Sequence, residues 1–588
     1  MREGINSMKM DNIAFRLIDM TSPVTLFLAK KVITMDPAAP CAECVASQHG
    51  TIVAVGPTET VMKALALHHC AIEVDDRFRE YYIYPGFSEH HMHPHMMGAF
   101  LRDAHYIGYV DRKGVDGTRL PGIQSVDALI ERLRQLLRHD HARLASSATQ
   151  WLNCWGFDPL LLNNADVSRD VLDQVSTEYP ICLSHASGHV INVNSRALTL
   201  CGYERMPADP NLFCYEDGRL NGTIAELAMM QPAIANGAAR MDFSLEGLLD
   251  AGEIATRIAR IHGCTSITDK GTNIPVIPGN MAAEAWIKGA AQKRLHTRVI
   301  MEPWFSTIER WRYKTWSGWE AVEALRNEYH PRLSVGNYKL LADGSIQAFT
   351  AHLLPDQSYV TPGKPNGLLL MDADAMAKHI ALAESHGMSC SIHTNGNGAT
   401  EAALEAIALV RANNPNPGFR HSLEHCQLAT ENQFYRMARL GVTPNLFANH
   451  LYFWGDVHCK YTVGPHGVRR MDACRSATRY GLKHGVHSDD MVTEVAPLFS
   501  AWCAVNRRSL TGVVYGEDQC LTVDEAMRVI TYNHAWLAHQ DDVRGSIELG
   551  KWADFTVLEE EATEAVRERL KDIRIIGTVI GGDDIMLN

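Results

Sequence analysis

The sequence lacks the features that mark membrane and secreted proteins. Across its 588 residues no apolar run approaches the roughly 18–20 residues that a membrane-spanning helix needs, and the mean hydropathy is −0.15. Residues 1–23 carry charges throughout and contain no apolar core of the kind found in signal peptides. We therefore expect no membrane association, and we interpret residues 1–23 as an N-terminal extension of a cytoplasmic protein.

Long runs of one charge sign are also missing. No block of five or more basic residues occurs, and the formal net charge of −13 is spread over mixed signs. Nucleic acids and anionic membranes select basic patches, so neither is expected as a partner. The 14 cysteines are scattered along the chain. Without a secretion signal, we expect them to be reduced thiols.

Histidine, by contrast, is abundant and clustered. The chain has 28 histidines, and the stretch PGFSEHHMHPHMMG (85–98) places four of them within six positions. Because side chains alternate along a strand, His91 and His93 would share one face while His90 points to the other. Such pairs also occur by chance on exposed strands. The stretch therefore predicts a metal site only in combination with further ligands.

Both ends of the chain have the pattern of short antiparallel strands. Residues 24–84 contain segments such as ASQHGTIVAVGP, in which β-branched residues surround a glycine turn, and residues 541–588 contain GSIELGKWADFTVLEEE. A chain of this length exceeds one compact domain. We predict that the two ends form one discontinuous, small β-sandwich domain beside a central domain of residues 85–540.

The central part alternates short buried strands with amphipathic helical stretches such as DADAMAKHIALAESHG. This alternation is typical of βα units, and eight units predict a TIM-like (β/α)8 barrel of the α/β class. The gap after the first strand is too long for one crossover, so residues 105–250 are expected to form an inserted subdomain. The expected barrel strands are 83–90, 265–271, 297–304, 336–344, 387–396, 420–426, 441–448 and 484–490.

Further metal-binding residue types lie at or near the ends of the later predicted strands. They are Lys339 in NYKLLADGS, His393 in SIHTNG, His425 in LEHC and Asp489 in VHSDD. Barrel enzymes place their chemistry at the carboxyl ends of the strands. Taken singly, His393 or His425 would more often be a core histidine whose hydrogen bonds are satisfied than a ligand. The whole set, in strand order, predicts a metal centre.

The motifs that surround these residues resemble those of a known family. PGFSEHHMHP, KLLADGS, IHTNG, RHSLEHCQ, HSDD and the tail GSIELGKWADFTVL are similar to the amidohydrolase superfamily. The resemblance is to amidohydrolase family 3, the group that includes the N-substituted formamide deformylases. It extends from Val32 to Leu558 and includes SGHVINVNSRAL (187–198) in the predicted insertion.

The resemblance implies two divalent metal ions, and neutral imidazole with carboxylate suits Zn²⁺. A CO2-derived carbamate on Lys339 would convert a repelled ammonium into an anionic ligand that bridges the two ions. If Lys339 instead points away, a single-metal site remains. The implied ligands are His91 and His93 for the first ion, His393 and His425 for the second, Lys339 as the bridge, and Asp489 on the first ion.

Several residues around the predicted centre are candidates for substrate contact. Pro94 is expected to end the first strand and to leave His95 in a loop beside the pocket. His487 stands where the family commonly has a small residue, and the family often has a substrate-facing histidine after strand seven. For most of the candidate residues, a structural role in the core is as well supported as contact with the substrate. The candidates are His95, Trp155, His189, His450 and His487.

The resemblance implies an enzyme that hydrolyses the C–N bond of an amide, N-acyl or N-formyl group on a small molecule. A hydroxide bridging the two ions would attack the carbonyl, and Asp489 would shuttle the proton to the leaving nitrogen. Alternatives are a deaminase, a cyclic-amide or heterocycle hydrolase, and an ester, lactone or carbamate hydrolase. A non-catalytic binding protein would not need the shuttle. We expect a homo-oligomer, with a dimer favoured.

Overall fold

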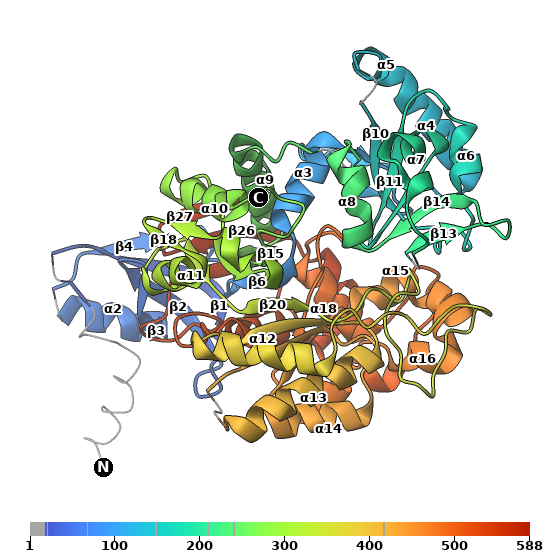
Figure 1. The fold of residues 1–588 in the computed structure, drawn as a ribbon. Coiled ribbons are helices and arrows are strands. Elements are labelled where there is room, and N and C mark those ends of the chain that lie inside the picture. Colours follow the sequence, from blue (N-terminus) through green and yellow to red (C-terminus); the bar gives the residue numbers. More distant parts are fainter. Residues whose placement is uncertain are drawn as a thin grey trace.

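The computed structural model describes residues 18–588, except residues 20, 68, 148–149, 210, 239–240 and 416–417 (Figure 1). The expected N-terminal extension therefore lies largely outside the described residues. The described part has a mixed α/β fold, as predicted. None of its helices combines the length and apolar character needed to span a bilayer.

Strands from the two ends of the chain share one sheet. β5 pairs antiparallel with β25, so residues 82–85 lie beside residues 555–558. Neighbouring side chains of β1, Leu26 and Phe27, enter different core clusters, as expected for a sheet covered on both faces. The sequence predicted a β-sandwich here, but hydrogen bonding joins all the strands into one continuous sheet. The strands are β1 (Val24–Ile33), β2 (Cys41–Gln48), β3 (Thr51–Gly56), β4 (Ile72–Asp75), β5 (Tyr82–Pro85), β25 (Phe555–Leu558), β26 (Ile575–Ile580) and β27 (Asp584–Leu587).

The central part contains two parallel sheets, of orders β19-β16-β15-β6 and β20-β21-β22-β23-β24. Two isolated bridges connect the two sheets, one between Met92 of β6 and Asp490 and the other between Trp304, which follows β16, and Lys339 of β20. Each of the eight strands predicted from the sequence overlaps an observed strand. The strands are β6 (Phe87–Met92), β15 (Cys264–Thr272), β16 (Arg298–Pro303), β19 (Leu333–Val335), β20 (Tyr338–Leu341), β21 (Cys390–Thr394), β22 (Ser422–His425), β23 (Thr443–Leu446) and β24 (Gly485–Val486).

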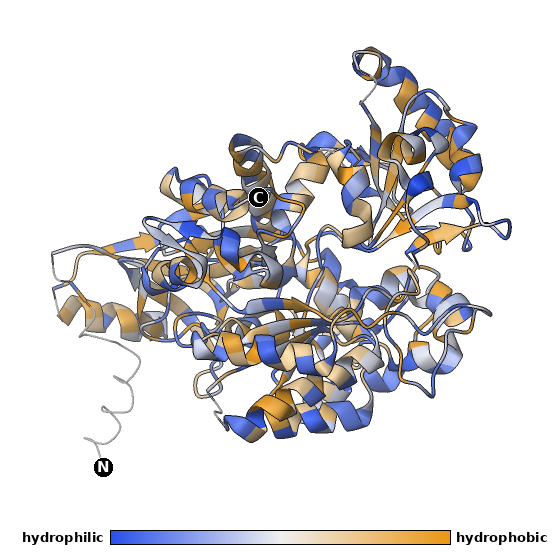
Figure 2. Cartoon of the chain, in the orientation of Figure 1, coloured by the Kyte–Doolittle hydropathy of each residue, from blue (hydrophilic) through white to orange (hydrophobic). Residues whose placement is uncertain are grey.

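Amphipathic helices follow these strands. Figure 2 shows hydrophobic and hydrophilic residues alternating around them, and their apolar side chains join one large core with the strands. α14 begins with a capping box, in which the Thr430 and Gln433 side chains each bond the other's backbone. The helices are α9 (Leu245–Ile261), α10 (Met281–Ala291), α11 (Gly318–Asn327), α12 (Ala373–Ser385), α13 (Asn397–Asn413) and α14 (Glu431–Leu440).

The segment between α3 (Pro94–Asp103) and α9 forms a six-stranded sheet of its own, in the order β13-β14-β12-β11-β10-β7. Figure 1 shows it beyond the central strands, covered by α4 (Val126–His139) and α7 (Ser195–Cys201), with α8 (Leu227–Ala235) on the side of the central part. Its strands are β7 (His105–Tyr106), β10 (Leu152–Phe157), β11 (Ile181–His185), β12 (Val190–Val193), β13 (Leu212–Cys214) and β14 (Leu220–Ala225).

The contact between α3 and α9 generates a stability prediction. A Cβ atom at Gly98 would lie 2.1 Å from the backbone oxygen of Ala251, which cannot move without shifting α9. Gly98→Ala should therefore destabilise the protein by about 1–3 kcal/mol, as overpacking does. Thermal unfolding measures the loss.

Gly289→Ala is the matched control, because a Cβ there would meet only flexible side-chain ends, of Leu295 at 3.1 Å and of Leu249 at 3.5 Å. Alanine is favoured over glycine in helices by up to about 1 kcal/mol, so this variant should be as stable as the parent or more stable. A Gly98→Ala protein as stable as the parent would contradict the close packing of the two helices.

Candidate metal centre

All six predicted ligands converge in the structure, because the ends of neighbouring parallel strands meet at one edge of a sheet. Five of them are buried and His93 is half-buried. They are His91 in β6, His93 just after it, Lys339 in β20, His393 in β21, His425 at the end of β22, and Asp489 in the loop after β24.

His91, His93 and Asp489 form the first group. Oδ1 of Asp489 lies 3.5 Å from Nε2 of His91 and 3.4 Å from Nε2 of His93. The ligand atoms of all three residues lie within 4.8 Å of one another. One divalent ion can contact the three atoms after only small side-chain shifts, given ligand bonds of about 2.0–2.2 Å.

His393 and His425 form the second group. Nδ1 of His393 lies 3.0 Å from Nε2 of His425, and Nδ1 of His425 lies 3.8 Å from Oδ2 of Asp489. Nε2 of His393 is 3.0 Å from the backbone oxygen of Gly344, which holds its N–H and leaves Nδ1 free as a ligand. Asp489 therefore lies between the two groups.

The protonation states suit metal binding. Burial lowers the pKa of His93 to about 3, and it lowers the pKa values of His91, His393 and His425 well below the ordinary value, so these imidazoles are neutral. Burial raises the pKa of Asp489 to about 7 in the metal-free protein. A cation would favour the ionised carboxylate.

Lys339 is a buried lysine whose Nζ has no hydrogen-bond partner among the described residues. Burial lowers its pKa to about 8, which makes the neutral amine accessible near neutral pH. Oδ1 of Asp489 and Nδ1 of His425 likewise lack hydrogen-bond partners in this part of the chain. Buried polar atoms are rarely left unpaired, so these orphaned atoms fit a divalent metal centre.

A buried carboxylate supports the first group from behind. Oε2 of Glu424 lies 2.7 Å from Nδ1 of His91 and accepts a bond of 2.8 Å from Asn445. Its other oxygen accepts from Lys270 at 3.1 Å, and Lys270 also donates to Glu302 at 2.8 Å. Burial would raise the pKa of Glu424, but Lys270 and Lys339 hold it well below its usual range. The carboxylate thus fixes the tautomer of His91 with Nε2 directed at Asp489.

Glu424 and Lys270 were not predicted from the sequence to be functional residues. The available signal was a charged residue within each buried strand, in HSLEH and TSITDKG. Charges are almost never fully buried unless they are paired.

The loop that carries Asp489 is held in a strained conformation. Asp489 has φ of +51° and His425 has φ of +70°, both in the left-handed region that non-glycine residues rarely adopt. Asp489 N–H donates to the His91 carbonyl at 3.0 Å, and His93 N–H donates to the Asp490 carbonyl at 2.6 Å. The Asp490 side chain forms a buried ion pair with Arg112 of the inserted segment. Strand β6 and the inserted segment together position Asp489.

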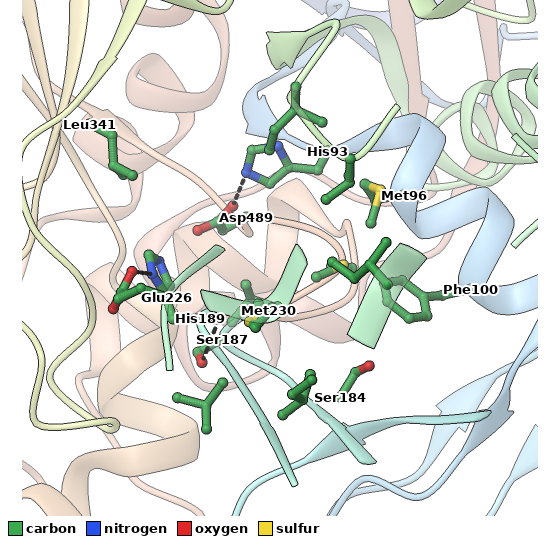
Figure 3. Close-up of a pocket in the computed structure, with 18 of the residues that line it drawn as sticks. His93, Met96, Phe100, Ser184, Ser187, His189, Glu226, Met230, Leu341 and Asp489 are labelled. Carbon is green, nitrogen blue, oxygen red and sulfur yellow. Dashed lines mark hydrogen bonds and ion pairs between the residues drawn. The ribbon is translucent and has the colours of Figure 1, made fainter. Parts of the chain in front are cut away.

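A cavity of about 150 Å³ opens in front of this group (Figure 3). His189 of the inserted segment lines it, and Nδ1 of His189 lies 3.1 Å from Oε2 of Glu226. Burial lowers the pKa of His189, but the Glu226 carboxylate outweighs burial and raises it above its ordinary value. The pair faces the metal-binding side chains across the cavity.

The other predicted substrate contacts lie away from the cavity wall. β6 ends at Met92 and Pro94 begins α3, so His95 is helical and not in the predicted loop, and its ring packs on Trp286 at 4.0 Å. Trp155 stacks on Phe100 at 5.4 Å.

His450 and His487 are also buried beside the centre and not on the cavity wall. The His487 ring lies between His91, at 4.5 Å, and Phe447, at 4.7 Å, and the His450 ring packs on Phe447 at 4.0 Å. Ligand atoms of His91, His425 and His487 lie within 4.8 Å of one another. His487 therefore packs on the candidate ligands His91 and His425 and does not line the cavity.

The chain is similar to known proteins along nearly its whole length. The N-substituted formamide deformylase of Arthrobacter pascens is 24% identical over 569 residues, covering 95% of this chain and 97% of its own. The protein LONG AFTER FAR-RED 3 of Arabidopsis thaliana is 22% identical, covering 94% of this chain and 90% of its own. A metal-dependent hydrolase of Pyrococcus horikoshii shares the fold, with a TM-score of 0.69 and 19% identity over 93% of this chain and 99% of its own. Residues 80–584 match the amidohydrolase family, so the chain belongs to this family and is a metal-dependent hydrolase that acts on carbon–nitrogen bonds.

Proposed function

We propose that the protein hydrolyses the amide, N-acyl or N-formyl bond of a small molecule at a centre of two zinc ions. The observation that carries the proposal is the position of Asp489, within 3.4–3.8 Å of three histidines and on the wall of a cavity large enough for a small molecule. The likeness to an N-substituted formamide deformylase along nearly the whole chain supports an acyl C–N bond as the target.

The proposed fold is a closed (β/α)8 barrel with the inserted segment and the terminal sheet as separate domains. The two bridges, Met92 with Asp490 and Trp304 with Lys339, support closure because each connects one parallel sheet to the other. In a closed barrel every ligand lies on the same rim. The fold shared with the Pyrococcus horikoshii hydrolase supports this assignment.

Each residue has a distinct task in the proposed reaction. His91 and His93 would hold one ion, His393 and His425 the other, and carboxylated Lys339 would bridge them. When bound, the ions supply an activated water and polarise the substrate carbonyl. Asp489 accepts the proton that the water loses and delivers it to the nitrogen of the leaving amine.

The bridging role of Lys339 is tested by metal content. Lys339→Ala should reduce the metal bound per chain by at least half and abolish measurable turnover, because the shared ligand is lost. Elemental analysis after loading with zinc and bicarbonate measures the content. Lys113→Ala, at an exposed position, is the control and should bind as much metal as the parent. A Lys339→Ala protein that keeps two ions would contradict the bridge.

The proton-transfer role of Asp489 is tested by its amide variant. Asp489→Asn keeps an oxygen near the metal but cannot accept a proton, so turnover should fall roughly 10²–10⁴-fold while most of the metal is retained. In the parent, kcat/KM should fall on the acid side, where the carboxylate becomes protonated, and the variant should lose this limb. Near-normal turnover by the metal-loaded variant would assign the proton transfer to another group.

A further inference from the structure

The cavity in front of the metal-binding residues has two chemically different sides. Figure 3 shows Glu226 and His189 on one side, with Met96 and Phe100 on the other, and Asp489 with His93 at one end. The apolar side continues onto α8 and the segment before α9. Its principal side chains are Met96, Phe100, Met230, Ile234, Met241 and Phe243.

All charged or titratable side chains on the cavity wall belong to the metal centre or to the His189–Glu226 pair, among the described lining residues. His189 and Glu226 already neutralise each other at 3.1 Å. Arg112, which could have met a substrate anion, is bound to Asp490 and does not line the cavity. Ser184 and Ser187 contribute neutral hydroxyl groups. The apolar side therefore offers no partner for a charged substituent.

A charge buried without a partner is strongly disfavoured, whereas an apolar group gains free energy by leaving water for such a wall. We propose that the substrate is an uncharged amide that carries a bulky apolar substituent, aromatic or branched alkyl, seated against Met96, Phe100 and Phe243. N-acyl amino acids and dipeptides, whose free carboxylate would enter the same space, are rejected. The inference deepens the proposed function and depends on it for the position of the scissile bond.

The composition of the apolar side also determines how strictly the cavity discriminates between substituents of different shape. Met96, Met230 and Met241 contribute flexible thioether side chains, which adapt to different shapes and make favourable contacts with aromatic rings. The cavity therefore selects for the absence of charge more strongly than for one particular ring or chain. Related neutral substituents should be hydrolysed at similar rates.

The test compares matched pairs of compounds on the zinc-loaded enzyme. N-benzylformamide is paired with its para-carboxylate, and N-isobutylacetamide is paired with N-acetylvaline. The neutral member of each pair should have a kcat/KM at least about 10²-fold higher, the scale on which sites discriminate when a polar group is left unpaired. Equal or faster hydrolysis of the carboxylates would overturn the inference.

Met96→Arg should reverse this preference, because the half-buried Met96 side chain can place a guanidinium beside a substrate carboxylate. The kcat/KM ratio of each pair should shift toward the carboxylate by about tenfold or more. Met62→Arg, the same change at an exposed methionine of α2 (Thr58–Leu67), is the control and should leave the ratio unchanged. If the Met96→Arg enzyme is active and its kcat/KM ratio for each pair equals that of the parent, the substituent does not bind against Met96.

Calorimetric binding to the metal-free protein separates this inference from the proposed reaction. Selective binding of the neutral member, without turnover of either member by the zinc-loaded enzyme, would support the apolar specificity and contradict the amide hydrolysis. Equal binding of both members would overturn the specificity, even if both are hydrolysed.

Discussion

The buried contact between Glu424 and His91 is the interaction on which the arrangement of the metal-binding residues depends. Glu424 accepts from His91, Lys270 and Asn445, and Lys270 in turn donates to Glu302, so Lys270 links the two buried carboxylates beneath the centre. Buried charges are tolerated only when they are paired and hydrogen-bonded. The network therefore fixes the orientation of the His91 ring, and with it the direction of Nε2 toward Asp489.

The inserted segment anchors the loop that carries Asp489 and forms part of the cavity wall. Its Arg112 holds Asp490, and the Asp490 carbonyl accepts from His93, so the strained loop that carries Asp489 is anchored from both sides. The same segment supplies His189, Glu226 and much of the apolar wall. In the proposed enzyme, the catalytic residues come mainly from the central strands and the substrate-selecting residues mainly from the inserted segment, so substrate preference can change while the reaction is retained.

The sequence predicted the mixed α/β class, the eight central strands and the convergence of all six ligands, because parallel strands bring their ends together whatever lies between them. The predictions from the sequence were wrong where tertiary packing determines the position of a side chain. Pro94 fits the first turn of a helix as well as the end of a strand, so His95 was wrongly expected in a loop. Trp155 and His450 have residue types suited to substrate contact, but neighbouring rings bury them. Glu424 was overlooked because its importance lies in three partners that are far away in the sequence.

Anomalous diffraction at the zinc edge, from crystals of the metal-loaded protein, locates the ions directly. We expect two peaks, one contacted by His91, His93 and Asp489 and the other by His393 and His425, with extra density on Nζ of Lys339 between them. A single peak contacted by His91, His425 and His487, with Lys339 ending in a plain amine, would contradict it.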